Sequence, residues 1–190
     1  MLCEPVLNTG QPPILASSRL EYGILMLHHV GTDQDIPFIF DLLKKEADRN
    51  WDITQLLESF RDTYAYIAGS HTSQAFIVQL DGEPLFEIET HNARMHVDQH
   101  TQFQPLEGDF YINLFAGAMD KVDPAVYLAA LHLCRNYFFG FPEVQRIIVP
   151  LTAGNETYKY SQLVTAAGFG KLMDRSKPTE PDLYSISRPE

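Results

Sequence analysis

Histidines and carboxylates are the residues of this chain that could move protons or hold a metal. The histidines that a metal site could use are His28, His29, His91, His96, His100 and His132. None of them shows the paired spacing that a strong zinc site requires. Of these, His91, His96 and His100 fall at a predicted strand end and in the polar stretch after it. We therefore expect no metal centre and consider surface or capping roles the ordinary alternative.

Three carboxylates stand where a general base could be needed. Glu87 and Glu89 alternate with apolar residues along one predicted strand, which indicates a strand with one solvated face. Asp109 follows Gly108 at the start of another strand, a position where a carboxylate often serves only turn chemistry. The sequence leaves open whether these groups bind a substrate, accept a proton or are simply solvated.

Composition narrows the class of protein. The chain has 190 residues, of which 45% are hydrophobic and 21% charged, as in a globular domain. Its net charge of −11 argues against a general nucleic-acid binder and would suit a cationic partner such as an amine, besides favouring solubility. Cys3 and Cys134 are too few for a disulfide framework. Ser-His-Asp, Cys-His, Walker and dinucleotide motifs are absent from the sequence.

The chain shows no sign of a membrane or export segment. No apolar run approaches the length that crosses a bilayer, and the first residues lack a basic segment followed by an apolar one. We therefore expect a cytoplasmic protein without a membrane partner. We expect one domain over 1–190, with 1–22 as an extended arm because of its Asn, Gly and Pro residues.

The elements that must position these residues follow from hydrophobic periodicity. The predicted strands cover 23–30, 73–80, 83–91, 108–117, 146–151, 171–176 and 182–187. The predicted helices cover 36–49, a segment from about Thr54, 123–139, and a segment from Asn155 to about 166. This order predicts an α/β fold with a central mixed sheet flanked by helices. The strands 108–116 and 145–151 should run parallel, because a helix connects them.

Two short signals define element ends. Asp81-Gly82 between two alternating runs predicts a tight hairpin. Asp123-Pro124 predicts a helix start, with a capping carboxylate and a proline in the first turn. The helix that follows is apolar almost all round, which indicates burial against a sheet.

An ordered set of residues in the second half resembles a known enzyme family. The set is Gly108-Asp109, Tyr137-Phe138-Phe139 with Pro142, Arg146 to Pro150, Asn155, and Gly168-Phe169. It is similar to the GNAT acyltransferases that acylate hydroxylated lysine or ornithine in siderophore biosynthesis. The resemblance implies the GNAT fold, with the strands 108–116 and 145–151 splayed apart. It implies acetyl-CoA or a longer acyl-CoA as donor and a small-molecule amine or hydroxylamine as acceptor. For the assembly we expect a monomer or homodimer.

The resemblance also implies a site. The proposed base of that branch, a histidine, falls on Asn113, whose amide cannot accept a proton at neutral pH. His91, His96, Glu87 and Asp109 are therefore the alternative bases. Residues that would hold coenzyme A are Leu114, Phe115, Ala116, Gly117, Lys121, Ala125, Asn155 and Tyr158.

The segment before the buried helix departs from the family pattern. Gly117 and Lys121 suit an anion, whereas Asp120 and Asp123 oppose one and Pro124 lacks an N–H. Two readings therefore remain open: an acyl-CoA-dependent N-acyltransferase, or a GNAT-fold binding or accessory module that has lost its chemistry and does not use coenzyme A.

Overall fold

The computed structural model describes residues 14–21, 23–31, 35–46, 53–95, 103–115, 123–151, 157–173 and 181–189. In chain order the elements are β1 (Ile14–Leu20), β2 (Gly23–His29), α1 (Ile36–Glu46), α2 (Ile53–Ala68), β3 (Ser73–Leu80), β4 (Glu83–Asn92), β5 (Asp109–Phe115), α3 (Pro124–Phe138), β6 (Arg146–Leu151), α4 (Thr157–Ala166), β7 (Gly170–Met173) and β8 (Asp182–Ser187).

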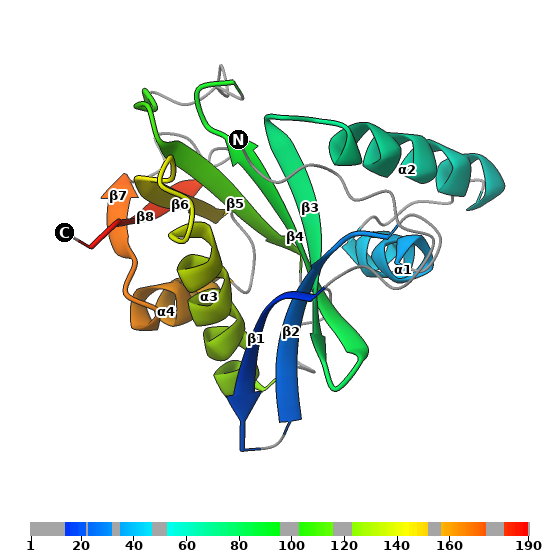
Figure 1. Ribbon diagram of the computed structural model, residues 1–190, viewed down its shortest axis with the longest axis horizontal. Coiled ribbons are helices and arrows are strands. Elements are labelled where there is room, and N and C mark those ends of the chain that lie inside the picture. The colour runs from blue at the N-terminus through cyan, green and yellow to red at the C-terminus, as the bar shows by residue number, and fades with distance from the viewer. Residues whose placement is uncertain are drawn as a thin grey trace. The chain divides into compact units, whose positions relative to one another are not determined.

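The strands form one mixed sheet. Their order in it is β1-β2-β3-β4-β5-β6-β8-β7 (Figure 1). Neighbours β1–β2, β2–β3, β6–β8 and β7–β8 are antiparallel, whereas β5 and β6 are parallel. The predicted α/β class, with a mixed sheet flanked by helices, is confirmed. The parallel direction of β5 and β6 is confirmed as well.

Strand β1 is an element that the sequence pattern did not reveal. Residues 14–20, expected as part of an extended arm, pair with β2 from Leu20 opposite Gly23 to Ile14 opposite His28. The strand lies at the sheet edge, and its residues are exposed or half-buried. An edge strand is held by backbone hydrogen bonds on one side, so it needs no apolar periodicity.

The chain divides into two compact units. The first comprises Met1–Glu89 with Leu114–Val122, and the second comprises Thr90–Asn113 with Asp123–Glu190. In the first unit, α1 and α2 lie side by side, with α2 against β3 (Figure 1). Their shared core consists of Ile36, Ile39, Tyr64, Ile67, Ala75 and Ile77. The unit thus has a core of its own.

The predicted hairpin joins β3 to β4. Asp81 has φ 49° and Gly82 has φ 92°. Two successive positive φ angles are the geometry of a tight two-residue turn, which Asp-Gly adopts readily. The Asp81 carboxylate also accepts a hydrogen bond of 2.8 Å from the N–H of Ile24, so this turn is tied to the start of β2.

Strand β4 differs from the prediction of one solvated face. Phe86, Glu87 and Ile88 are all fully buried, although they alternate between the two faces of the strand. The alternation of Glu with apolar residues therefore marks a buried carboxylate and not a wet face. Alternation cannot separate these cases, because it shows which face a side chain is on and not what covers that face.

In the second unit, α3 supplies most of the helical core. Its buried residues are Val126, Tyr127, Ala130, Leu131, Leu133, Cys134 and Phe138. Burial raises the pKa of the Cys134 thiol to about 12, so this cysteine stays protonated and is not a nucleophile. Helix α4 lies beside α3 and against β6 (Figure 1). Among the described helices, none is long and apolar enough to cross a membrane.

Candidate functional site

The starts of β5 and β6 are joined by the Gly-Asp pair. Gly108 has φ 84°, and its carbonyl accepts hydrogen bonds from the N–H groups of Gln145 (2.8 Å) and Arg146 (3.1 Å). A Cβ at this position would lie 2.5 Å from the Gln145 side chain. Only glycine accommodates both the conformation and this close approach. The glycine therefore serves to bring the two parallel strands together.

Asp109 completes this junction. Its side chain is 3% exposed and accepts hydrogen bonds from Arg146 Nε (2.9 Å, at Oδ1), Arg146 Nη2 (2.6 Å, at Oδ2) and the Leu106 N–H (2.7 Å, at Oδ2). The hydrogen bonds that Arg146 donates to Asp109 raise the pKa of Arg146, and the guanidinium also lies over the Phe103 ring at 5.5 Å. Both oxygens of Asp109 are thus occupied by a cation and a backbone donor. This arrangement favours a structural role over that of a base or a substrate ligand.

Beyond this junction the two strands separate. Over the described residues of both strands, the parallel register covers only Asp109–Tyr111 opposite Arg146–Ile148. β6 then continues in register with β8, from Val149 opposite Tyr184 to Leu151 opposite Asp182. Pro150 has no N–H to give to a neighbouring strand, so it suits the point of separation. The divergence predicted for these strands is present.

Asn113 lies on β5 just past the paired stretch. Its side chain is half-buried, as are those of Tyr111, Leu114 and Phe115, whereas Phe110 and Ile112 are buried. In the second unit the backbone of Ile112 and Asn113 has no β6 partner within the described register. This edge can accept an extended ligand chain that contains amide groups. The amide of Asn113 can donate or accept a hydrogen bond there, but it cannot act as a base.

The N-terminus of α3 is capped by its own chain. Asp123 stands at the N-cap with φ −58° and ψ 127°, and its Oδ1 accepts a 2.8 Å hydrogen bond from the Ala125 N–H. Its carbonyl accepts from Val126 N–H (2.9 Å) and Tyr127 N–H (3.2 Å). Pro124 has no N–H to offer. Over residues 125–127, each backbone N–H therefore has a partner, and the anionic side chain of Asp123 is one of them.

These two features fit different parts of an acyl-coenzyme A. The unpaired edge of β5 suits the neutral, amide-containing pantetheine arm. The described start of α3 does not suit the pyrophosphate, because a phosphate site at a helix N-terminus needs open N–H groups and a positive end. Ala125, which we expected to hold coenzyme A, instead donates its N–H to Asp123.

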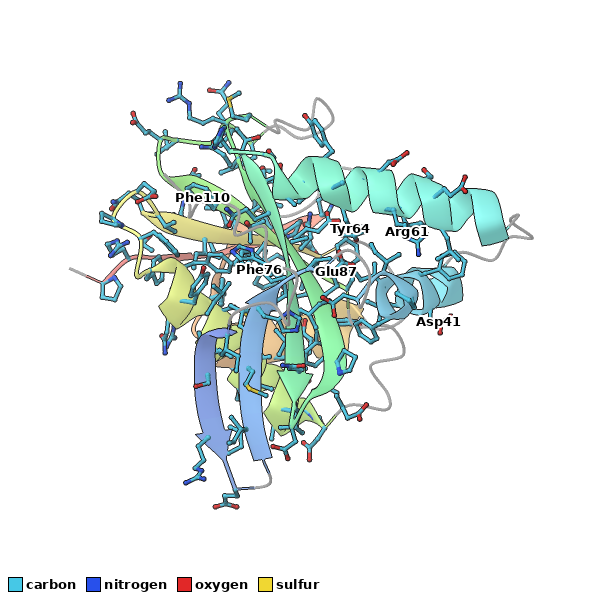
Figure 2. The ribbon with its side chains drawn as sticks, turned by 45° about the vertical axis from the view of Figure 1, so that its right-hand side comes forward. Asp41, Arg61, Tyr64, Phe76, Glu87 and Phe110 are labelled. Atoms are coloured by element: carbon cyan, nitrogen blue, oxygen red, sulfur yellow. The ribbon has the colours of Figure 1, made fainter. Side chains whose placement is uncertain are left out.

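A buried carboxylate lies in the first unit. The Tyr64 hydroxyl of α2 donates hydrogen bonds to Oε1 of Glu87 and, at 3.5 Å, to Oε1 of Glu89 on β4 (Figure 2). Burial and the two carboxylates raise the pKa of Tyr64, so its hydroxyl stays protonated and acts as a donor. Glu87 therefore belongs to an internal polar cluster. The prediction that it is a solvated strand carboxylate is wrong.

Sequence reasoning did not single out Tyr64. A usable signal was its spacing: Phe60, Tyr64 and Ile67 follow at intervals of four and three, so they share one face of α2. Phe60 stacks on Tyr64 at 6.3 Å between ring centroids. A tyrosine on a buried helix face needs a partner for its hydroxyl, and a strand carboxylate can supply it.

His91 and Asp109 are the two expected bases among the described residues that lie in the same unit as Asn113, and Asp109 is engaged as described above. His91 has a different environment. It is half-buried on β4, the strand beside β5 in the sheet, and the two strands are linked where the Ala93 N–H donates to the Asp109 carbonyl at 2.9 Å. Of the other expected site residues, His96, Ala116, Gly117, Lys121 and Asn155 lie outside the described residues, as does the side chain of Tyr158. Among the residues that the structure describes, no group of three His, Cys, Asp or Glu side chains could hold a metal ion.

The likeness to solved structures supports the fold. An uncharacterized protein from Bacillus halodurans superposes with a TM-score of 0.69 at 16% identity, over 92% of this chain and 92% of that one. The aminoglycoside acetyltransferase AAC(6')-Ib, solved with coenzyme A and kanamycin, has a TM-score of 0.68 at 14% identity, over 86% and 95%. RimJ from Mycobacterium smegmatis, solved with CoA-disulfide, has a TM-score of 0.66 at 15% identity, over 93% and 88%.

Sequence comparison gives the family. A search of curated proteins finds no significant match. The family model described as acetyltransferase (GNAT) domain matches residues 33–175, which is well over half of the chain. This range contains the junction of β5 and β6, the separation beyond it, and helix α3. The chain therefore belongs to the GNAT family of N-acetyltransferases.

Proposed function

We propose that this chain transfers an acyl group from an acyl thioester of the coenzyme A type to a nitrogen of a small molecule, a hydroxylated lysine or ornithine of the siderophore type. The observation that carries the reaction class is the β5–β6 pair, joined at its start and separated past Tyr111 and Ile148, in a chain of the GNAT family. The siderophore-type acceptor rests on the sequence resemblance around Gly108-Asp109 and Arg146 to Pro150. A net charge of −11 suits an acceptor that carries an amino group.

The reaction forms a C–N bond and breaks a C–S bond, and it replaces an N–H bond by an S–H bond. A bound acyl thioester supplies the activated acyl carbon. A base of the chain takes the proton of the acceptor nitrogen as the C–N bond forms and the C–S bond breaks, and the leaving sulfur takes up a proton. The chain must therefore supply a base and hold the acceptor beside the separated strands.

His91 is the base that we propose among the described candidates. Asp109 has both oxygens engaged, and Glu87 is fully buried beside the Tyr64 hydroxyl. His91 is half-buried, lies in the unit that holds Asn113, and carries an imidazole, the side chain that most often serves as a general base. We assign Asn113 the task of holding the acceptor or the thioester carbonyl through its amide.

The test is acyl transfer with purified protein. Acetyl-CoA and a longer acyl-CoA are offered with hydroxylysine, hydroxyornithine and kanamycin as acceptors, and products are identified by mass spectrometry. His91→Gln should lower kcat/KM by ~10²–10⁴-fold and change the shape of the pH profile. The matched control is His71→Gln, at an exposed position in the turn before β3, which should change neither quantity.

The outcomes separate the parts of the proposal. Transfer to kanamycin alone would contradict the siderophore-type acceptor but keep the transferase. An unchanged rate and pH profile in His91→Gln would exclude His91 as the base. A cytoplasmic location and a monomer or homodimer also remain part of the proposal, and size-exclusion chromatography with light scattering tests the latter.

A second candidate function is a GNAT-fold binding or accessory module without catalysis. The capped start of α3 and the presence of Asn113 at the expected base position favour it. No transfer to any acceptor, together with no calorimetric binding of acetyl-CoA or of the longer acyl-CoA, would support this module and reject the enzyme.

A further inference from the structure

The start of α3 does not suit the nucleotide end of a coenzyme A-type donor, whereas the edge of β5 suits its pantetheine arm. From this difference we infer that the chain selects its acyl donor by the pantetheine arm and gains little from the nucleotide end. The donor class is then acyl thioesters of pantetheine, with acetyl-CoA preferred over acetyl-pantetheine by at most about tenfold. This inference rests on the proposed function, because it concerns the donor of the same reaction.

The nucleotide end meets an occupied helix terminus. The positive end of a helix binds phosphate through N–H groups that have no intrahelical partner. In α3 the Asp123 carboxylate takes the Ala125 N–H at 2.8 Å, and the Asp123 carbonyl takes the next two N–H groups. Pro124 removes a further donor. A pyrophosphate placed here would have to displace a carboxylate of its own charge sign.

The pantetheine arm meets a different surface. At Ile112 and Asn113, within the second unit, the β5 backbone has no β6 partner in the described register, so the amides of a pantetheine can pair with it as an added strand would. The arm is neutral, so the acidic character of the chain, with its net charge of −11, does not oppose it. Recognition by this edge needs no contribution from α3.

The experiment compares the two donors on the same protein. Initial rates with acetyl-CoA and acetyl-pantetheine give kcat/KM for each with a common acceptor, and calorimetry gives the affinities of coenzyme A and pantetheine. The wild-type preference for acetyl-CoA should be at most about tenfold, equivalent to about 1.4 kcal/mol. A larger preference overturns the inference.

A charge variant tests the cause. Asp123→Ser keeps a good N-cap residue and removes the carboxylate. At low salt it should raise kcat/KM for acetyl-CoA about two- to fivefold and leave acetyl-pantetheine unchanged, because only the former carries phosphates near the helix end. The matched control, Asp41→Ser, removes the same charge from an exposed position on α1 (Figure 2) and should change neither donor. Equal gains in both variants would mean that net charge acts and the cap does not.

The two proposals fail in different ways. No transfer from either thioester and no binding of either thiol would reject the proposed function and this inference with it. A strong preference for acetyl-CoA, with normal transfer, would reject only this inference. An Asp123→Ser protein that unfolds at the same urea concentration as the wild type ensures that a changed rate reflects donor recognition.

Discussion

The two ends of the β5–β6 pair differ in how their residues are held. At the joined end, Gly108, Asp109 and Arg146 bind each other and neighbouring backbone, with distances of 2.6–3.1 Å. At the separated end, Asn113 is half-buried on an edge without a described β6 partner, and the cap residue Asp123 is exposed. The residues of this strand pair that resemble the siderophore branch, Gly108-Asp109 and Arg146 to Pro150, include the three residues of this junction and the proline at which the strands part. The departures are Asn113, past the paired stretch, and Asp123, at the start of α3.

This difference teaches what the resemblance measures. The matching residues build the scaffold that brings two parallel strands together and lets them part. The departing residues stand where donor and acceptor would be bound. A motif match at the joined end therefore supports the fold and reaction class, whereas substrate choice depends on residues where the match is weakest.

The largest expected effect is at the joined end. Asp109→Ala should lower the free energy of unfolding by about 3–5 kcal/mol, because it leaves the half-buried Arg146 and the Leu106 N–H without their acceptor. Asp109→Asn should cost less, since it keeps an acceptor for Leu106. Urea denaturation of both variants measures this. A loss below about 1 kcal/mol in Asp109→Ala would remove the distinction between the two ends.

Three glycines sharpen the same point. Gly108→Ala should cost about 2–3 kcal/mol, because it combines a positive φ with a Cβ 2.5 Å from Gln145 and 3.0 Å from the Glu143 carbonyl. Gly82→Ala has the positive φ but open space, so about 1 kcal/mol is expected. Gly170→Ala has neither constraint and should be near neutral. Thermal unfolding ranks the three variants by stability. Equal losses of stability at Gly108 and Gly82 would show that the close approach to Glu143 and Gln145, just before β6, is unimportant.

Substitutions at the start of α3 should lower the free energy of unfolding less than those at the joined end. Asp123→Ala should lower the free energy of unfolding by about 0.5–2 kcal/mol, because the Ala125 N–H loses its acceptor. Asp123→Ser should lose only a few tenths, since serine caps as well as aspartate. Chemical denaturation of the pair separates the cap from the charge. If serine is as harmful as alanine, the carboxylate itself stabilises the helix.

The smallest effect on stability is expected at the separated end. Asn113→Ala should change the free energy of unfolding by no more than about 0.5 kcal/mol, as for substitutions away from buried networks. Its kcat/KM should fall about three- to tenfold, the value of one lost hydrogen bond. Asn113→His should raise transfer if it supplies a second base. A large stability loss in Asn113→Ala would make this end structural too.

The sequence by itself determined most of the local structure. The Asp81-Gly82 turn and the Asp123-Pro124 cap follow from residue types a few positions apart, and the parallel direction of β5 and β6 follows from the helix between them; all are present. These features depend on backbone sterics, on a nearby hydrogen bond, and on the crossover connection of a strand-helix-strand unit. The edge strand β1 was not predicted, because backbone pairing with β2 holds it in place. Such pairing requires no periodic pattern of apolar residues in the sequence.

Only the tertiary structure decided which carboxylates are available. From the sequence, Glu87 and Asp109 were both candidate bases, since each is an acidic residue next to an apolar one. In the fold, Arg146 from 37 positions along the chain occupies Asp109, and Tyr64 from 23 positions away holds Glu87. Whether a carboxylate is available depends on which donors occupy it, and those donors are brought to it by long-range packing. For the same reason, the sequence indicated that the segment before α3 departs from a phosphate site. Only the structure showed that Asp123 accepts hydrogen bonds from the first N–H groups of the helix.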